Sequence, residues 1–328
     1  MEKYTLGFDI GGTKCAVVLG KGEIPADISN GFIIDKIKFD TNQPRGWQKI
    51  VGELFDSARE ILDRNSVAAE QVIACGISCG GPLDSKKGVI MSPPNLPDWD
   101  NVPIVEMTEK ALGIKTYLQN DANACALAEW HFGAGKGTEN MIFLTFGTGM
   151  GAGLILNGRL YSGTNDMAGE VGHIRMAPDG PVGYGKKGSF EGFCSGGGIA
   201  QLAKQIVLNK LSTGVVPSFC NDESQLDSVT AKSVAVAACS GDETALEIYG
   251  ICGEYLGKGL AVLIDILNPQ AVVIGSIYQR SSALLQEKMA AAIRAEALSL
   301  SADVCRILPA TLGDSIGDYA ALGVAFSD

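Results

Sequence analysis

The sequence predicts an α/β protein built from two lobes. A chain of 328 residues is long for one hydrophobic core and suits two domains of ordinary size. Hydrophobic residues make up 46% of it and charged residues 19%, with 42 glycines and no long polar tract, which is typical of a well-buried α/β protein. The third observation is an internal similarity, because residues 5–22 and 141–160 each read as an apolar strand, a Gly/Thr turn and a second apolar strand. We expect one such hairpin in each lobe.

The remaining elements follow from hydrophobic spacing along the chain. Residues 46–65 repeat apolar side chains at helical intervals, and residues 72–78 return as a buried strand. A second buried strand is expected at 271–276, and the Gly- and Lys-rich stretch 178–189 predicts a surface loop. Further helices are expected, in chain order, at residues 107–115, 122–135, 195–211, 244–268 and, after a turn, 312–325.

Composition and charge argue against several partners. The net charge is −11, and no Lys/Arg cluster interrupts it, so nucleic acid is not an expected partner. No apolar run approaches the roughly 20 residues that span a bilayer, and the first residues lack the regions of a secretory signal, so we expect a cytoplasmic protein. Nine scattered cysteines, an odd number without paired spacing, predict reduced thiols that mostly fill the core.

The first glycine turn combines a carboxylate, flexible backbone, a hydroxyl and an ammonium. It consists of Asp9, Gly11, Gly12, Thr13 and Lys14, with one apolar residue between the first two. These groups are those of a nucleotide phosphate site with a nearby magnesium ion. An ordinary hairpin turn with an exposed lysine is the alternative that glycine content alone favours.

The second glycine turn has a different pattern. Gly147, Thr148 and Gly149 open a run in which glycines alternate up to residue 153. Alternating glycines weaken a strand, so close approach of the backbone to a ligand is the better interpretation. Neither turn fits the Walker A motif or G-x-G-x-x-G, which argues against a P-loop NTPase and a nicotinamide dehydrogenase.

Two further segments carry candidate polar groups. Asn120 and Asp121 follow an extended segment and precede a helix, and strand ends are where α/β proteins keep their chemistry. The alternative is that Asp121 or Asn123 only caps that helix. Glu170 and His173 follow the second turn, although a lone histidine is more often structural than functional.

The order of these motifs resembles that of the ROK sugar kinases almost from end to end. Any one motif is weak, and the signal lies in their number and order. The resemblance implies an α/β, two-lobed actin-like (ribonuclease H-like) ATPase fold, with a smaller lobe of residues 1–119 completed by 314–328, a larger lobe of 120–313, and a homodimer. The motifs are Asp9–Lys14, Gly80-Gly81-Pro82, Asn120–Asn123, Gly147–Gly153, Glu170–His173, Glu191 with Ser195-Gly196, and Asn268-Pro269-Gln270 with the strand that follows.

The resemblance also assigns roles to residues. ATP is expected between the two glycine turns, with the sugar deeper in the cleft and Asp121 as the base. Asp9 is expected near Mg²⁺, through water. The implied phosphate-binding residues are Gly11, Gly12, Thr13, Lys14, Gly147, Thr148 and Gly149. The implied sugar-binding residues are Gly81, Asn95, Asn120, Asp121, Glu170, His173 and Glu191.

One departure from the family pattern concerns zinc. Members commonly bind zinc through the motif's histidine and three cysteines of a C-x-C-G-x-x-G-C-x-E stretch. Here the cysteine positions hold Val182, Tyr184 and Ser189, while Gly185, Gly188 and Glu191 keep the frame. We expect no structural zinc, and packing of other residues to position His173 and Glu191.

The expected reaction is transfer of the γ-phosphoryl group of Mg·ATP to a hexose, with the C6 hydroxyl of glucose as the expected acceptor. Kinases of N-acetylglucosamine, N-acetylmannosamine and fructose share these motifs, and some relatives use polyphosphate as the donor. A sugar-responsive regulator is the alternative of another class, but such proteins carry a DNA-binding segment ahead of the first turn, where this chain has eight residues before Asp9. A catalytically silent sugar-binding protein is the third.

Overall fold

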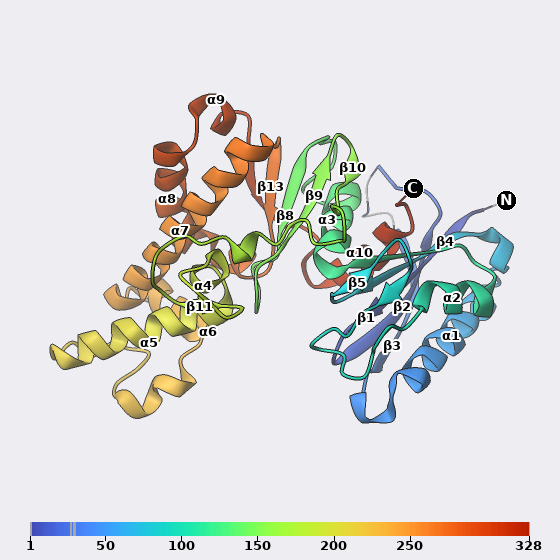
Figure 1. The fold of residues 1–328 in the computed structure, drawn as a ribbon, viewed down its shortest axis with the longest axis horizontal. Helices are drawn as coiled ribbons and strands as arrows, with labels where there is room; N and C mark the ends of the chain where they lie inside the picture. The colour runs from blue at the N-terminus through green and yellow to red at the C-terminus, as the bar shows by residue number, and fades with distance from the viewer. Residues whose placement is uncertain (1, 27, 29–30, 328) are drawn as a thin grey trace. The chain divides into compact units, whose positions relative to one another are not determined.

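Two five-stranded sheets dominate the computed structural model, which describes residues 2–26, 28 and 31–327 (Figure 1). The strand order of the first sheet is β3-β2-β1-β4-β7, and that of the second is β10-β9-β8-β13-β14. The first sheet consists of β1 (Tyr4–Ile10), β2 (Lys14–Lys21), β3 (Ile33–Asp40), β4 (Val72–Cys79) and β7 (Thr116–Asn120). The second consists of β8 (Met141–Leu144), β9 (Ala152–Leu156), β10 (Arg159–Leu160), β13 (Ala271–Ile274) and β14 (Arg306–Pro309).

Burial along the first sheet shows which strands are central. Strands β1, β2 and β4 are buried almost without interruption, as expected for strands covered on both faces, whereas the edge strand β3 alternates with the period of two that one exposed face produces. Helix α1 (Trp47–Arg64) buries a stripe at helical spacing that includes Leu54 and Ile61, and α2 (Ile104–Leu112) follows it in the chain. These elements share one hydrophobic core with the fully buried Trp99.

The other helices against this sheet are α3 (Asp121–Phe132) and α10 (Ile316–Val324). Helix α10 packs directly on the strands, since a Cβ on Gly76 of β4 would lie 2.1 Å from the carbonyl oxygen of Ala321. Only glycine allows this approach. The end of the chain is therefore an integral layer of the same unit as its beginning.

The second sheet is followed and interspersed in the chain by a larger set of helices, which pack mainly on one another. Strand β8 pairs in parallel with β13, and β13 in parallel with β14. The 25-residue α7 ends where Asn268 adopts the left-handed conformation (φ 45°), as helix C-termini often do. It crosses α8 closely, because a Cβ on Gly257 would lie 2.4 Å from the carbonyl oxygen of Met289. The helices are α4 (Phe190–Phe193), α5 (Gly196–Ser212), α6 (Ala231–Cys239), α7 (Glu243–Leu267), α8 (Ile277–Glu296) and α9 (Ser299–Ala302).

The expected irregular loop at 178–189 is partly ordered into strands. It contains a two-stranded hairpin of β11 (Val182–Gly183) and β12 (Lys186–Lys187). Another short pair, β5 (Leu83–Asp84) and β6 (Val89–Ile90), follows β4. Strands of two residues show no periodicity, so hydrophobic spacing gave no signal for either pair.

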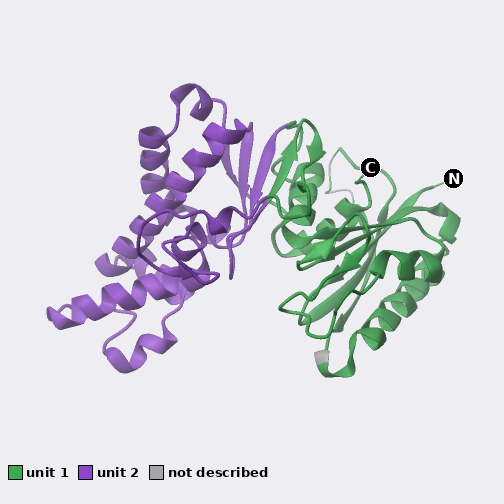
Figure 2. Cartoon of the chain, viewed as in Figure 1, with its two compact units in different colours: residues 1–139, 153–168, 311–328 green, residues 140–152, 169–310 purple. Residues whose placement is uncertain are grey.

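Backbone contacts divide the chain into two compact units, which Figure 2 shows in green and purple. Unit 1 comprises residues 1–139, 153–168 and 311–328, and unit 2 comprises 140–152 and 169–310. The expected lobes of 1–119 with 314–328, and of 120–313, differ from these units at 120–139, 153–168 and 311–313.

The reason for this difference lies in α3. A Cβ on Gly153 would lie 2.5 Å from the carbonyl oxygen of Ala122, so the chain after the second turn packs on this helix. The buried carboxylate of Glu129, also on α3, accepts hydrogen bonds from the backbone N–H groups of Thr311 and Leu312, at 2.9 and 3.0 Å. Both contacts join segments that are distant in sequence, and no local pattern reveals them.

Candidate functional site

Three parallel strands of unit 1 bring its predicted residues to one sheet edge. β1 pairs with β4 and β4 with β7, and Ile10, Cys79 and Asn120 lie in register. The carboxyl ends of parallel strands form the edge where α/β proteins bind ligands. The first glycine turn, the Gly80-Gly81 turn and Asp121 follow those three strand ends.

The first glycine turn is a tight, well-supported hairpin. The N–H of Gly11 donates to the carbonyl of Lys14 at 3.0 Å, and the hydroxyl of Thr41 donates to the carbonyl of Gly11 at 2.6 Å. The N–H of Thr41 donates to the carbonyl of Thr13 at 2.9 Å. The side chains of Thr13 and Lys14 are exposed, which leaves a hydroxyl and an ammonium at the surface of the turn.

Asn95 lies between the two turns of unit 1. A Cβ on Gly12 would be 2.4 Å from the backbone oxygen of Asn95, and a Cβ on Gly80 would be 3.0 Å from its side-chain oxygen. By contrast, a Cβ on Gly81 would meet no atom within 4 Å. The structure therefore brings Asn95 to the predicted site, although it lies on an irregular segment far from both turns in sequence.

Asp9, which precedes the first turn, has a buried carboxylate near a second negative charge. Its pKa is raised to about 6, chiefly by burial and next by the nearby negative charge of Asp318, while the charges of Lys36 and Lys38 act in the opposite direction. A carboxylate that lacks sufficient positive charge nearby is a suitable partner for a divalent cation. The chemistry of this group therefore fits the expected magnesium ion.

Sequence reasoning did not identify Asp318 as part of this site. The ammonium of Lys36 donates to both of its carboxylate oxygens, at 2.5 and 2.6 Å. A Cβ on the preceding Gly317 would lie 2.6 Å from the carboxylate of Asp9, so α10 begins directly beside the first turn. The pair Gly317-Asp318 at the start of the closing helix was the only hint in the sequence that this helix approaches a polar site.

Asp121 and Asn120 have separate roles at the start of α3. The side-chain oxygen of Asn120 accepts from the N–H of Asn123 at 2.8 Å and caps the helix. Asp121 is the first helical residue, is exposed, and accepts from the N–H of Ala122 at 2.8 Å. Desolvation by the surrounding protein raises the pKa of Asp121, while the hydrogen bonds from backbone N–H groups lower it in part. The residue that caps α3 is therefore Asn120 and not Asp121.

The second glycine turn is held by a different set of hydrogen bonds from the first. It is closed by hydrogen bonds between Thr145 and Gly151, including one of 2.8 Å from the N–H of Gly151 to the hydroxyl of Thr145. The N–H of Gly196, at the start of α5, donates to the carbonyl of Gly147 at 2.8 Å. A Cβ on Gly147 would meet nothing closer than the Ser276 hydroxyl, at 3.5 Å. The glycine at position 147 is therefore not required by contact with another part of the protein.

Glu191 contacts the second turn directly. Its carboxylate accepts from the N–H of Met150 at 3.0 Å, and a Cβ on Gly149 would lie 2.9 Å from the same oxygen. Gly172 also packs against the turn, since a Cβ added at this position would lie 2.2 Å from the carbonyl oxygen of Met150. The predicted residues Glu170, His173 and Glu191 therefore belong to segments that pack on this turn.

The donor set does not fit a structural zinc ion. His173, Val182 and Tyr184 are exposed, and the Ser189 hydroxyl is buried as the cap of α4, accepting from the N–H of Gly192 at 3.0 Å. Cys194 is buried, its thiol donates to the carbonyl of Cys252, and desolvation raises its pKa above the ordinary value, which disfavours the thiolate that zinc binds. Among the residues that the structure describes, no group of three or more His, Cys, Asp or Glu side chains could hold a metal ion.

Solved structures of sugar kinases share this fold. The ROK hexokinase from Thermus thermophilus superimposes with a TM-score of 0.78 and is 28% identical, over 99% of this chain and 97% of that chain. A ROK family glucokinase from Streptomyces griseus, in complex with glucose and AMPPNP, gives 0.69 at 28% identity, over 97% of this chain and 98% of that one. The predicted two-lobed actin-like ATPase fold is confirmed.

The family follows from the sequence match. Residues 5–326 match the model of the ROK family, so the chain belongs to this family. A glucokinase from Halalkalibacterium halodurans is 32% identical over 320 residues, which cover 96% of this chain and 93% of the relative. Among the described residues, no helix is both long and apolar enough to cross a membrane.

Proposed function

We propose that the protein is an ATP-dependent hexokinase of the glucokinase type, which phosphorylates glucose at its C6 hydroxyl. The similarity to glucokinases over almost the full length of both chains supports this reaction. The observation in this structure that carries the proposal is Asp121, a carboxylate with a raised pKa at the carboxyl end of β7. Asn120, and not Asp121, caps helix α3.

Asp121 acts as the general base. A carboxylate with a raised pKa accepts a proton more readily, and the C6 hydroxyl loses its proton as the phosphoryl group is transferred. Asn120 holds the first turn of α3 through the N–H of Asn123, so the base sits on a capped, rigid helix end. Correct placement supplies most of the catalysis in such a reaction.

Each glycine turn, taken by itself, offers groups that can bind phosphate. Backbone N–H groups, Thr13, Lys14 and Thr148 are available there, because these three side chains are exposed. Asp9 holds Mg²⁺ through water, because its carboxylate is buried beside the negative charge of Asp318. Bound with the nucleotide, this ion neutralises charge on the transferred group.

Family resemblance supports a sugar-binding role for Gly81, Asn95, Asn120 and Asp121 of unit 1. It supports the same role, independently, for Glu170, His173 and Glu191 of unit 2. Glu191 is also tied to the second glycine turn through Met150, so sugar and nucleotide share one positioned carboxylate. A cytoplasmic location and a homodimer are part of the proposal by family resemblance.

The alternatives are distinguished by one assay. Purified protein is incubated with ATP, Mg²⁺ and, in separate reactions, glucose, fructose, N-acetylglucosamine and N-acetylmannosamine, and ADP release is followed by enzymatic coupling. We expect the highest kcat/KM with glucose. Preference for an N-acetylated sugar or fructose would change the substrate and keep the reaction class. No turnover with any sugar, with either ATP or polyphosphate as the donor, would indicate a sugar-binding regulator.

A further inference from the structure

The segment that follows His173 forms a small antiparallel arrangement with the end of the 178–191 region. The N–H groups of Met176 and Ala177 both donate to the carbonyl of Gly188, at 2.8 and 3.0 Å. The N–H of Phe190 donates to the carbonyl of Ile174 at 2.8 Å. The chain on both sides of the β11–β12 hairpin is therefore ordered by backbone hydrogen bonds, and His173 lies at the edge of this arrangement.

Two polar side chains fix the hairpin at its two ends. Gln201 of α5 pairs with both backbone groups of Val182, accepting from its N–H at 3.0 Å and donating to its carbonyl at 2.9 Å. Lys186 of β12 donates from its ammonium to the carbonyl of His173 at 2.7 Å. A charged donor makes a stronger hydrogen bond than a neutral one. The hairpin thus connects α5 to the backbone of His173.

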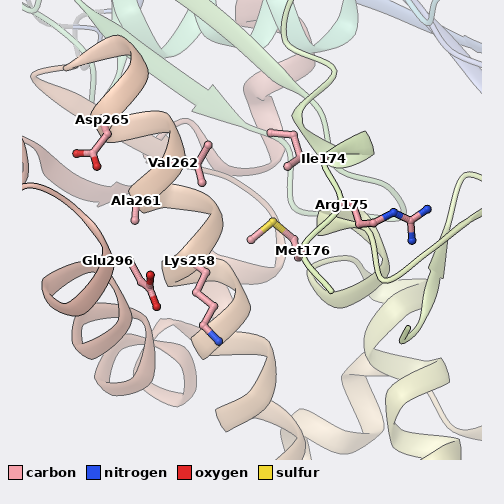
Figure 3. Close-up of a pocket in the computed structure, with 8 residues that line it drawn as sticks. All are labelled: Ile174, Arg175, Met176, Lys258, Ala261, Val262, Asp265 and Glu296. Carbon is pink, nitrogen blue, oxygen red and sulfur yellow. The ribbon is translucent and has the colours of Figure 1, made fainter. Parts of the chain in front are cut away.

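The other side of the same segment is less closely packed. Ile174 and Met176 line a pocket of about 320 Å³ with Ala261 and Val262 of α7, and Figure 3 shows these side chains around it. Space on this side means that α7 does not by itself set the position of the segment. The hydrogen bond from Lys186 therefore holds the backbone of His173 on the hairpin side, in addition to the packing of Gly172 on Met150.

We propose that Lys186 is a positioning residue for His173, with Gln201 as the second anchor of the hairpin. This proposal rests on the proposed function, in which His173 contacts the sugar. The ammonium of Lys186 fixes the carbonyl of His173 and so the direction of its backbone and imidazole. Side-chain hydrogen bonds thereby do in this chain what bound zinc does in relatives that have the cysteines.

The neighbouring Lys187 provides a matched control. It has the same charge on the same strand, but its ammonium lies 3.7 Å from Asp179, and both side chains are largely exposed. Exposed pairs of this kind contribute little to stability. A difference between substitutions at the two lysines therefore reports the contact with His173 and not the charge of the loop.

The experiment compares Lys186→Ala, Lys186→Arg, Gln201→Ala and Lys187→Ala with the parent, in full-length protein. Steady-state kinetics give kcat and the KM values for glucose and ATP, and thermal melting gives Tm. We expect Lys186→Ala to raise the KM for glucose by about 10-fold while the KM for ATP stays within about 2-fold. Lys186→Arg restores most of the glucose KM, Gln201→Ala has a smaller effect in the same direction, and Lys187→Ala has none.

Backbone hydrogen exchange tests the same contact without relying on turnover. We expect faster exchange of the amides at 174–177 and at Phe190 in Lys186→Ala than in Lys187→Ala, with unchanged exchange in α7. Equal exchange in the two variants would overturn the proposal whether or not the parent is a kinase. Equal rises in both KM values, together with a lower Tm, would overturn it by showing general destabilisation. A parent that exchanges as expected and phosphorylates no sugar would refute the proposed function alone.

Discussion

The two glycine turns look alike in sequence but owe their glycines to different causes. At the first turn, a Cβ on Gly12 would lie 2.4 Å from the backbone of Asn95, and one on Gly11 would lie 2.8 Å from the carbonyl oxygen of Lys14. At the second, a Cβ on Gly147 would have room in the protein itself. Packing within the protein therefore explains the glycines of the first turn. It does not explain glycine at position 147, which we attribute to close approach of a ligand.

The comparison also separates the chemistry of the two turns. The first turn carries an acidic side chain, Asp9, whose pKa is raised and which lies near Asp318 on α10. The second turn has no such acid of its own, and Glu191 is hydrogen-bonded to it from α4. We infer that the first turn serves the cation in addition to phosphate, whereas the second serves phosphate alone, through its backbone N–H groups.

The largest expected effect on this comparison comes from Asp9→Asn. The pKa of Asp9 in the folded protein, about 6, lies above the ordinary 3.8. Ionisation of Asp9 therefore lowers the free energy of unfolding progressively as pH rises from about 4 to about 6. The variant should therefore be more stable than the parent at pH 7.5, by at most about 3 kcal/mol, and should lack the loss that the parent shows between pH 4 and 7.5. Its KM for Mg·ATP should rise by about 10-fold or more.

Denaturant melts at both pH values and steady-state kinetics check this prediction. Asp40→Asn, at an exposed aspartate at the end of β3, is the control and should change neither quantity. A less stable Asp9→Asn variant with normal use of ATP would show that Asp9 is a structural residue, and the division of roles between the turns would be wrong.

A smaller effect is expected from Gly147→Ala, compared with Gly12→Ala. The methyl group at position 147 fits the protein but occupies space next to the backbone where a phosphate oxygen would bind. We expect an unchanged Tm and a KM for ATP about 5- to 10-fold higher, with little change for glucose. Gly12→Ala should lower stability by about 1–3 kcal/mol, because its methyl group collides with Asn95. Melting curves and both KM values separate the cases, and a Gly147→Ala variant that binds ATP normally would remove the ligand explanation.

The smallest expected effect is that of a chelator. Elemental analysis of the purified protein should find no stoichiometric zinc, because a closed site needs about four N or S ligands and positions 182, 184 and 189 provide none. Treatment with a chelator, followed by restoration of Mg²⁺, should leave Tm and the KM for glucose unchanged. Loss of stability that zinc and not magnesium reverses would mean that the chain rebuilds the site from other residues.

Regular elements were predictable where their periodicity was strong. Helix α1 (Trp47–Arg64) and helix α7 (Glu243–Leu267) follow the expected 46–65 and 244–268 closely, because both carry continuous apolar patterns. Helix α8 was missed, since its buried face includes Ser281 and Ala292, which blur an apolar stripe. The short β11–β12 hairpin lacks any periodic signal.

The site was predictable in its motifs and less so in its supports. Asp121 could be proposed from its place after a strand, but the sequence left open whether it capped the helix, and the structure gives that role to Asn120. Asp318 approaches Asp9 only because the closing helix α10 returns to the first sheet. Lys186 and Gln201 act on backbone groups, and such contacts leave no motif in a sequence.

The most direct test of the account is the rate of phosphoryl transfer in Asp121→Asn. Asparagine keeps the shape and the capped start of α3 and removes the basic carboxylate, so kcat should fall by roughly 10²-fold or more with Tm unchanged. The measurement is ADP and hexose phosphate formed from saturating glucose and Mg·ATP, in variant and parent side by side. A folded Asp121→Asn enzyme that phosphorylates glucose at the parent's rate would contradict the role of Asp121 as the base.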